Sequence, residues 1–484
     1  MPGGIGEEDI VVLVLPYIRT AREGVLRLAA LLERYGTYES NGVAFNDENE
    51  IWWMETIGGH HWMAKRVPDD VAVIMPNQFG MDSFDFDDAF GAQQAHLCSK
   101  DLREFIATYH LDCNRGGAFN PRLAFGSHSD QDHVYNTPRA WYMGRYLAPT
   151  TYRWDGPNAD FTPESDNIPW SFVPERRLAV EEVKEILSSN YKGTPYDPYL
   201  NHDTGMRGKY RSIGINRTGV TSVCQIRPDA PDCCKGLEWI CFGSTTFDAL
   251  LPVYPNVRKM PPYLENVTLD ASTDNFYWGS RLIGALADHS YNQCVQIVTR
   301  YQNAVLTEGR RLVLEYDRRI AETGDASLCE EANGKLAAMA KEQTDKALTA
   351  VLHESSATMK NGYNRADNGA RAIRRVYGSF TVCILSRPSG RDVLEGDRRQ
   401  AARDHADRRL LSVRRAYPAG GRAGHRQDDA VPRVCQGVRW QLQAHPVHAR
   451  RDAERCDRHQ FLQHPHRRVR VPSRSRLCRR GPCR

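Results

Sequence analysis

The stretch GSHSDQDH groups the side chains best suited to binding a metal ion. Within six residues it holds two imidazoles, His128 and His133, and two carboxylates, Asp130 and Asp132. Nitrogen and oxygen donors of this kind could bind a divalent cation. Donors packed so closely on one loop cannot easily reach a single ion together, so a polar surface loop or gate loop is the favoured interpretation.

Two adjacent histidines, His60 and His61, lie in the stretch GGHHWM. Neighbouring side chains on a strand point to opposite faces of the sheet, so the two rings are not expected to share a chemical task. A structural role is the favoured interpretation for both.

The sequence has 13 cysteines, any of which could be weighed as a nucleophile. The reactive form is the thiolate, which needs a nearby base or a positive environment. No such sequence context surrounds the candidates Cys98, Cys113, Cys224, Cys241 and Cys294. Ordinary packing is favoured for each, and because no CxxC pair occurs, a structural zinc site is not expected.

The segment INRT, residues 215–218, carries Asn216 and Arg217 where a strand could present both to a substrate. An amide can donate a hydrogen bond to an oxyanion, and a guanidinium can form a forked pair with a carboxylate. Taken alone, the segment is as compatible with a structural role as with a role in substrate binding.

Local patterns predict the elements that would position these side chains. Apolar residues at helical spacing predict a helix from Ile18 to Arg34. Short apolar runs separated by NDENE, GG and PDD predict a meander of four strands, with the alternation expected for a sheet covered on one face. These strands are 43–46, 51–56, 60–66 and 71–76.

The rest of the body is expected to contain loops, helices and a second pair of strands. A helix is predicted from Ser99 to Tyr109, with Ser99 as its N-cap, and a loop-rich stretch follows to about Pro174. LAVEEVKEILSSNY predicts a helix, YRSIGINRTGVTSVCQIR and GLEWICFGS predict two paired strands, and residues 274–359 predict a helical region. This order favours an α+β fold of stacked layers with an antiparallel sheet.

The C-terminal stretch differs in composition from the remainder of the chain. From Arg387 to Arg484 it contains 25 arginines, ten acidic residues and no lysine, although the whole chain has a net charge of only +4. With few large aliphatic side chains it cannot offset the entropy lost on ordering, so disorder is expected. Nucleic-acid binding through the arginines is an alternative. The absence of lysine and the abundance of residues with GC-rich codons favour a shift of reading frame near Ser386.

The predicted organisation is therefore one domain over residues 1–386 and an Arg-rich tail over residues 387–484. No run approaches the ~18 apolar residues of a membrane span. Acidic residues Glu7, Glu8 and Asp9 precede the first apolar patch, where a secretory leader would be positively charged. The expected location is the cytoplasm, without a membrane partner.

Seven stretches, taken in order, resemble one protein family. This family is the bacterial cysteine-type dipeptidases of the N-terminal-nucleophile (Ntn) hydrolase superfamily, peptidase family C69, of the dipeptidase A kind. The resemblance extends from Glu7 to about Arg365. The stretches are REGVLRLAALLERYG, GVAFNDENEIWWMETIGGHHWMAKRVPDD, SKDLREFIATY, DHVYNTPRAWYMGRYL, ILSSNYKGTPYDPY, RSIGINRT and LEWICFGSTTFDALLPVY.

The resemblance implies a four-layer αββα sandwich, cleavage of short peptides, and no metal or organic cofactor. It also implies a nucleophilic cysteine that is the first residue of the mature chain. The α-amine of that cysteine serves as general base, since its ordinary pKa of ~7.7–8.0 is close to working pH. Short peptides are the expected partners, and assembly into a homo-oligomer is left open.

The chain departs from the family pattern at its beginning. The segment that carries the nucleophile should precede the match to GEEDIVVLVLPY, and Met1 falls where the family is in mid-domain. We therefore expect an incomplete sandwich without the catalytic cysteine, and no peptidase activity from this polypeptide alone. We also expect poor folding, because sheet edges and apolar faces would lose their cover.

Four residues in matching motifs are the candidate substrate-binding residues. Asn216 and Arg217 are expected to contact the oxyanion or the substrate carboxylate, and Asn136 and Arg139 of YNTPR are expected to support the wall or a loop of the site. The alternatives are an Ntn amidase acting on a non-peptide acyl amide, nucleic-acid binding through the tail, and a metal-dependent hydrolase built on SHSDQDH.

Overall fold

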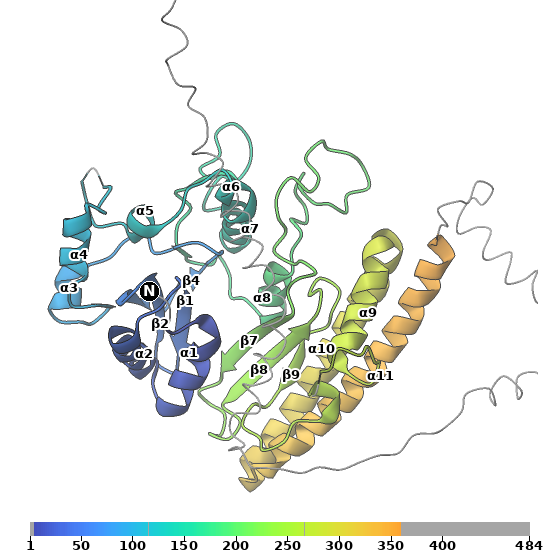
Figure 1. Cartoon of the computed structure of the whole chain (residues 1–484). Coiled ribbons are helices and arrows are strands. Elements are labelled where there is room, and N and C mark those ends of the chain that lie inside the picture. Colours follow the sequence, from blue (N-terminus) through green and yellow to red (C-terminus); the bar gives the residue numbers. More distant parts are fainter. Residues whose placement is uncertain (1–3, 115, 266, 360–484) are drawn as a thin grey trace, which may run out of the picture.

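The structure is a computed structural model that describes residues 4–114, 116–265 and 267–359. In these residues, helices and small antiparallel sheets are combined in one chain, which confirms the predicted α+β class (Figure 1). The predicted boundary between residues 386 and 387, and the Arg-rich tail itself, lie outside the described residues. Within the described part of the chain, no helix is both long and apolar enough to cross a membrane.

The first sheet has the strand order β1-β2-β3-β5 and is antiparallel throughout. Its strands are β1 (Gly42–Asn46), β2 (Ile51–Gly58), β3 (His61–Val67) and β5 (His96–Cys98). The first three confirm the predicted meander. The predicted fourth strand, 71–76, is wrong: only β4 (Ala72–Val73) forms there, and it pairs with β6 (Ser171–Phe172). The chain leaves the sheet at Pro68, and the free edge of β3 is filled by β5 instead.

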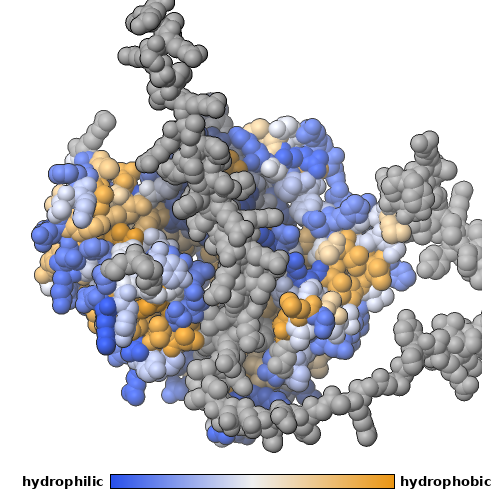
Figure 2. Space-filling model, in the orientation of Figure 1, coloured by the Kyte–Doolittle hydropathy of each residue, from blue (hydrophilic) through white to orange (hydrophobic). Residues whose placement is uncertain are grey.

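Two helices cover one face of this sheet, α1 (Glu7–Val14) and α2 (Ala21–Tyr35), joined by η1 (Leu15–Tyr17). Thr20 and Glu23 form a capping box that starts α2, in which each side chain satisfies a backbone N–H of the first turn. Apolar side chains on both elements form one core, and they include Val25, Leu28, Leu32, Trp52, Met54, Trp62 and Ala64. Some apolar side chains of α1, η1 and α2 reach the surface, as Figure 2 shows.

The opposite face of the first sheet is also covered, so the prediction of a sheet covered on one side is wrong. Met63 and Glu55, which point to this face, are 0% and 1% exposed. Met63 packs with Met81, Leu102 and Trp170, which come from segments that the sequence does not mark as core. Short helices α3 (Phe86–Phe90) and α4 (Leu102–Tyr109) lie in this region, and Asp101, not Ser99, is the N-cap of α4.

The second sheet has the order β7-β8-β9, with β7 (Val220–Ile226), β8 (Gly236–Phe242) and β9 (Leu251–Val253). The predicted pair, β7 and β8, is confirmed as antiparallel. The predicted helical region is confirmed as α9 (Phe276–His289), α10 (Tyr291–Thr323) and α11 (Ser327–Thr358), which pack along this sheet around a shared core (Figure 1). The short helix η2 (Pro262–Leu264) precedes them.

The segments between the two sheets contain α5 (Pro121–Phe125), α6 (Asp132–Tyr135), α7 (Thr137–Leu147) and α8 (Val180–Leu187). Helix α8 was expected from its sequence. Helix α7 lies in a stretch that is mostly loop, as predicted, but the helix itself was not predicted. Nine of its eleven residues are buried, so it lacks the polar face by which an amphipathic helix is identified.

Candidate active site

Residues 127–135 fold around the carboxylate of Asp132. Its Oδ2 accepts hydrogen bonds from Ser127 Oγ at 2.5 Å, Ser129 Oγ at 2.7 Å and Ser129 N at 3.0 Å. Its Oδ1 accepts from Asn136 Nδ2 at 2.6 Å. Burial raises the pKa of Asp132, but these donors outweigh burial and hold the pKa below its ordinary value. Asp132 is therefore a charged anchor for the loop and for the start of α6.

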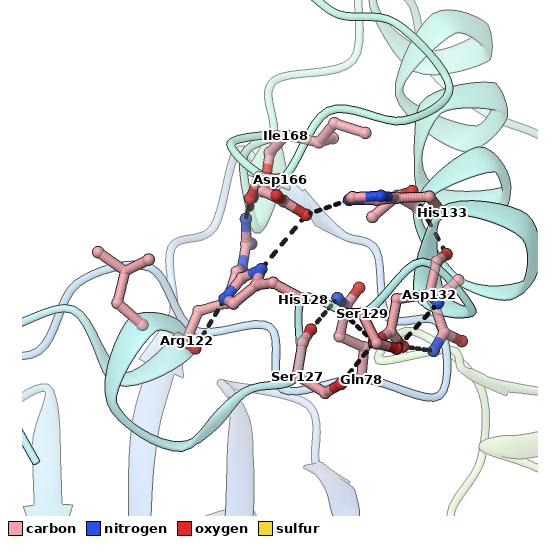
Figure 3. A network of polar contacts seen from close by, with 12 residues as sticks. Gln78, Arg122, Ser127, His128, Ser129, Asp132, His133, Asp166 and Ile168 are labelled. Atoms are coloured by element: carbon pink, nitrogen blue, oxygen red, sulfur yellow. Dashed lines mark hydrogen bonds and ion pairs between the residues drawn. The ribbon is translucent and has the colours of Figure 1, made fainter. Parts of the chain in front are cut away.

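The two histidines of the same loop point at one carboxylate, Asp166 (Figure 3). The Nδ1 atom of His128 lies 3.3 Å from Oδ1 of Asp166, and Nε2 of His133 lies 2.9 Å from the same oxygen. Among the described residues, no group of three or more His, Cys, Asp or Glu side chains could hold a metal ion. Asp130 is exposed. The GSHSDQDH stretch is a hydrogen-bonded loop, in agreement with the favoured interpretation.

Arg122, also drawn in Figure 3, ties this loop to the chain around it. Its guanidinium donates to the carbonyl oxygens of Gly80, Asp166 and Ile168. All three acceptors are backbone groups, so Arg122 acts as a structural clamp.

Arg139, a predicted site residue, is buried at the start of α7. Its Nε donates to the carbonyl of Tyr135 at 2.7 Å, and its Nη2 donates to Asn77 Oδ1 at 2.8 Å and Asn136 Oδ1 at 2.7 Å. Asn136 thus connects Arg139 to Asp132. Burial, and then repulsion by Arg211, lower the pKa of Arg139 to about 10. These contacts make Arg139 and Asn136 a fixed support beneath Tyr135.

Tyr135 links the predicted pair Asn136 and Arg139 to Arg217 of the other predicted pair. Its hydroxyl accepts a hydrogen bond from Nη2 of Arg217 at 3.2 Å, across 82 positions of sequence. The INRT segment that carries Arg217 forms a turn before β7, so the strand predicted for YRSIGINRTGVTSVCQIR begins too early. The backbone carbonyl of the neighbouring Asn216 accepts a hydrogen bond from Arg281 of α9. The YNTPR and INRT motifs therefore form one polar cluster.

Two residues of this cluster, Tyr135 and Arg211, were not among the residues predicted from the sequence. The Cζ atom of Arg211 lies 3.9 Å from the centroid of the Tyr135 ring, and that of Arg139 lies 5.0 Å from it. Both missed residues stand inside stretches that carry the family resemblance, DHVYNTPRAWYMGRYL and RSIGINRT. Tyr135 directly precedes Asn136, and Arg211 is the first residue of RSIGINRT. These positions are the only sequence features that could have pointed to the two residues.

The adjacent histidines have separate partners, as predicted. His60 lies in the turn between β2 and β3, not on a strand, and its Nδ1 donates to the carbonyl of Leu32 at 2.8 Å. The ring of His61 stacks on Phe105, with centroids 4.0 Å apart, and its Nε2 lies 3.3 Å from Oδ2 of Asp101.

Most cysteines that the structure describes have a raised pKa, the opposite of activation as a nucleophile. Burial raises the pKa of Cys98 to about 12, and it also raises the pKa values of Cys241 and Cys294, whereas Cys224 is exposed. A raised pKa leaves less thiolate at neutral pH. Cys113 is exposed. The prediction of ordinary packing is therefore supported for the buried members.

Comparison with known proteins places this cluster in a family context. The sequence model of peptidase family C69 matches residues 1–304. A dipeptidase of Bifidobacterium longum is 49% identical, over 76% of this chain and 77% of the relative. The probable dipeptidase A of Streptococcus pyogenes serotype M18 is 46% identical over 75% of each chain, and dipeptidase A of Lactobacillus helveticus is 37% identical over 75% of each.

Proposed function

Because this chain belongs to peptidase family C69, we propose that it carries the substrate-binding part of a dipeptidase site whose nucleophile is an N-terminal cysteine. The family and the dipeptidase relatives support peptide hydrolysis. The observation that carries the proposal is the junction at Tyr135, where Arg217 from one family motif contacts another family motif. A cluster of guanidinium and amide groups suits a substrate that has an anionic end and develops an oxyanion during cleavage.

The proposed chemistry divides between the cysteine and this cluster. The sulfur attacks the carbonyl carbon of the scissile bond while the α-amine of the same residue accepts the thiol proton. The tetrahedral oxyanion collapses to a thioester, the leaving amine takes the proton, and water then releases the acid. We assign Asn216 and Arg217 to contacts with the oxyanion or the substrate carboxylate, and Asn136 and Arg139 to support of the wall behind them.

None of the cysteines in the described residues fits the proposed nucleophile. Each is an interior residue without an α-amine, and those for which burial raises the pKa are also short of thiolate. We therefore propose that the described residues bind dipeptides and do not supply the nucleophile.

The four-layer αββα arrangement remains part of this proposal. The outer layers of this arrangement are supported by the placement of α1 and α2 on the first sheet and of α9, α10 and α11 along the second sheet (Figure 1), whereas the inner face of the first sheet packs on Met81, Leu102 and Trp170. An ion pair of 2.8 Å between Lys235 and Glu48 links the turn before β8 to the turn after β1.

The test is a comparison of binding and turnover on the purified full chain. Isothermal titration should detect binding of L-alanyl-L-alanine, and release of alanine should stay at the rate of the buffer control. The dipeptidase of Bifidobacterium longum serves as the positive control for hydrolysis. An N-acyl amine, such as N-acetylbutylamine, tests the amidase alternative, and we expect it to bind more weakly than the dipeptide.

Two results would contradict the proposal. Hydrolysis of the dipeptide that stops when an interior cysteine such as Cys113 is alkylated would show that the nucleophile lies within the described chain. Preferred binding of the N-acyl amine would favour the amidase.

A further inference from the structure

The backbone of Arg211 is held on both sides. Its N–H donates to the carbonyl of Val134 at 3.0 Å, and its carbonyl accepts from the hydroxyl of Tyr191 at 2.6 Å. Tyr191 is fully buried. Arg211 is thereby fixed against α6 and against the segment that follows α8, so the start of its side chain has a defined position beside Tyr135.

The guanidinium of Arg211 has an aromatic neighbour but lacks acceptors. It lies over the Tyr135 ring, while its Nε and Nη1 atoms are buried and have no hydrogen-bond partner. Buried polar groups in folded proteins are nearly always paired, and unpaired ones carry the full cost of desolvation. The two unpaired nitrogens of Arg211 therefore indicate a site where a hydrogen-bond acceptor from a ligand could bind.

The charges around Arg211 indicate that the missing acceptor is an anion. Burial lowers the pKa of Arg211, and repulsion by Arg217 lowers it further. Tyr135 and Tyr191 are the other described residues that influence this pKa, and neither is a carboxylate. Arg139 lies against the same Tyr135 ring. Three guanidinium groups thus converge on one phenol, which favours binding of a negative group between them.

We propose that Arg211 binds the free carboxylate of a peptide substrate and so selects short peptides with an unblocked C-terminus. The proposal rests on the proposed function, because it assigns a substrate contact within the same site. A carboxylate presents two acceptor oxygens in one plane, and a guanidinium meets them with parallel N–H···O bonds from Nη2 and from either Nε or Nη1, so that one of the two unpaired nitrogens would gain a partner. Stacking on Tyr135 holds the plane of the guanidinium, so less side-chain freedom is lost when the carboxylate binds.

The test compares L-alanyl-L-alanine with its C-terminal amide, L-alanyl-L-alaninamide, by calorimetry on the full chain. The wild type should bind the free acid about ten- to one-hundredfold more tightly than the amide, the range expected for hydrogen bonds to a charged group. Arg211→Gln should lose this preference, and Arg211→Lys should keep part of it. Arg300→Gln, at an exposed position of α10, is the matched control and should bind as the wild type does.

The melting temperature of the unliganded protein distinguishes a structural role of Arg211 from a binding role. If Arg211 binds a substrate, Arg211→Gln should melt at the same temperature as the wild type or higher, because the unpaired groups are removed. If Arg211→Gln instead melts lower and keeps the wild-type preference for the free acid over the amide, the proposal is overturned.

Modification of Arg211 by phenylglyoxal, mapped by mass spectrometry, separates this proposal from the proposed function. Acetate carries a carboxylate but no peptide bond. Protection by acetate but not by L-alanyl-L-alanine would support an anion site and overturn the peptide substrate. Binding of the dipeptide without protection of Arg211 would leave the proposed function standing and overturn Arg211 as its carboxylate contact. Protection by neither compound would also overturn the contact.

Discussion

Replacing Asp248 by asparagine should change the way in which stability depends on pH. Asp248 is fully buried beneath β8, α9 and α10. Its carboxylate accepts hydrogen bonds from Phe242 N, from Ala249 N at 2.8 Å, from Ser280 Oγ at 2.7 Å and from Tyr301 Oη at 3.1 Å. Burial raises its pKa from the ordinary 3.8 to about 6, and the hydrogen bonds only partly offset burial.

The sign follows from the two pKa values. A pKa raised on folding means that the folded state holds its proton up to a higher pH than the unfolded state. The contribution of Asp248 is fully present below about pH 4 and is lost as the pH rises through about 6. With pKa values of 3.8 and about 6, the free energy of unfolding should lose about 2 kcal/mol from this group between pH 4.5 and pH 7.

Urea unfolding of the wild type and of Asp248→Asn at several pH values measures this contribution. Asparagine cannot ionise, so the wild-type advantage over Asp248→Asn should shrink by about 2 kcal/mol from pH 4.5 to pH 7. Taking the difference at each pH removes the titration of other groups. Asp229→Asn, at an exposed position, is the control and should give a difference that is flat with pH.

The opposite slope would refute this reasoning. A carboxylate that accepts several hydrogen bonds can instead have a pKa well below its ordinary value. The refuting result is a free energy of unfolding of the wild type that exceeds that of Asp248→Asn by a larger amount at pH 7 than at pH 4.5. In that case the four donors outweigh burial, and the charged form of Asp248 stabilises the folded state.

Three further predictions concern the packing and the thiols. Thr20→Ala removes the N-cap of α2 and should lower the free energy of unfolding by about 1 kcal/mol in urea titrations. Leu28→Ala, at a fully buried position of α2, should cost about 2–5 kcal/mol, while Leu26→Ala, 48% exposed on the same helix, should cost less than about 0.5 kcal/mol; equal costs would mean that α2 does not pack as described. In alkylation mapped by mass spectrometry at pH 7.5, the exposed Cys113 should react in the native protein and the buried Cys241 only after unfolding. Early labelling of Cys241 would show that the second sheet opens readily.

The regular parts of the fold could be predicted where one face of an element is apolar and the other polar. Helix α2 has this pattern, and strands β1 to β3 are short apolar runs separated by polar turns. Their positions agree with the sequence-based expectation to within a few residues. Pairing of β7 with β8 could be predicted as well, because two strand-like runs follow each other with only residues 227–235 between them.

Elements buried on all sides, or paired over long distances, could not be predicted in this way. Helix α7 offers no polar face, and β5 is only three residues long. The contacts of β4 with β6, and of Met63 with Trp170, join segments about a hundred residues apart. Such contacts depend on the tertiary fold, which local periodicity does not record.

The candidate site shows the same division. The motifs identified Asn136, Arg139 and Arg217, which the structure brings into one cluster. The residues that complete the cluster, Tyr135 and Arg211, are recognised only by their contacts in space. A tyrosine or an arginine in isolation has no spacing rule that sets it apart from a surface residue.

The bond between Tyr135 and Arg217 closes a loop of 82 positions, so this polar cluster exists only while both ends of that loop are in place. A peptide that contacts both ends would bind the folded chain and not the unfolded one. At one hundred times its Kd, such a ligand adds about 2.7 kcal/mol to the stability of the folded state. Such a ligand would slow proteolysis that proceeds through the unfolded chain.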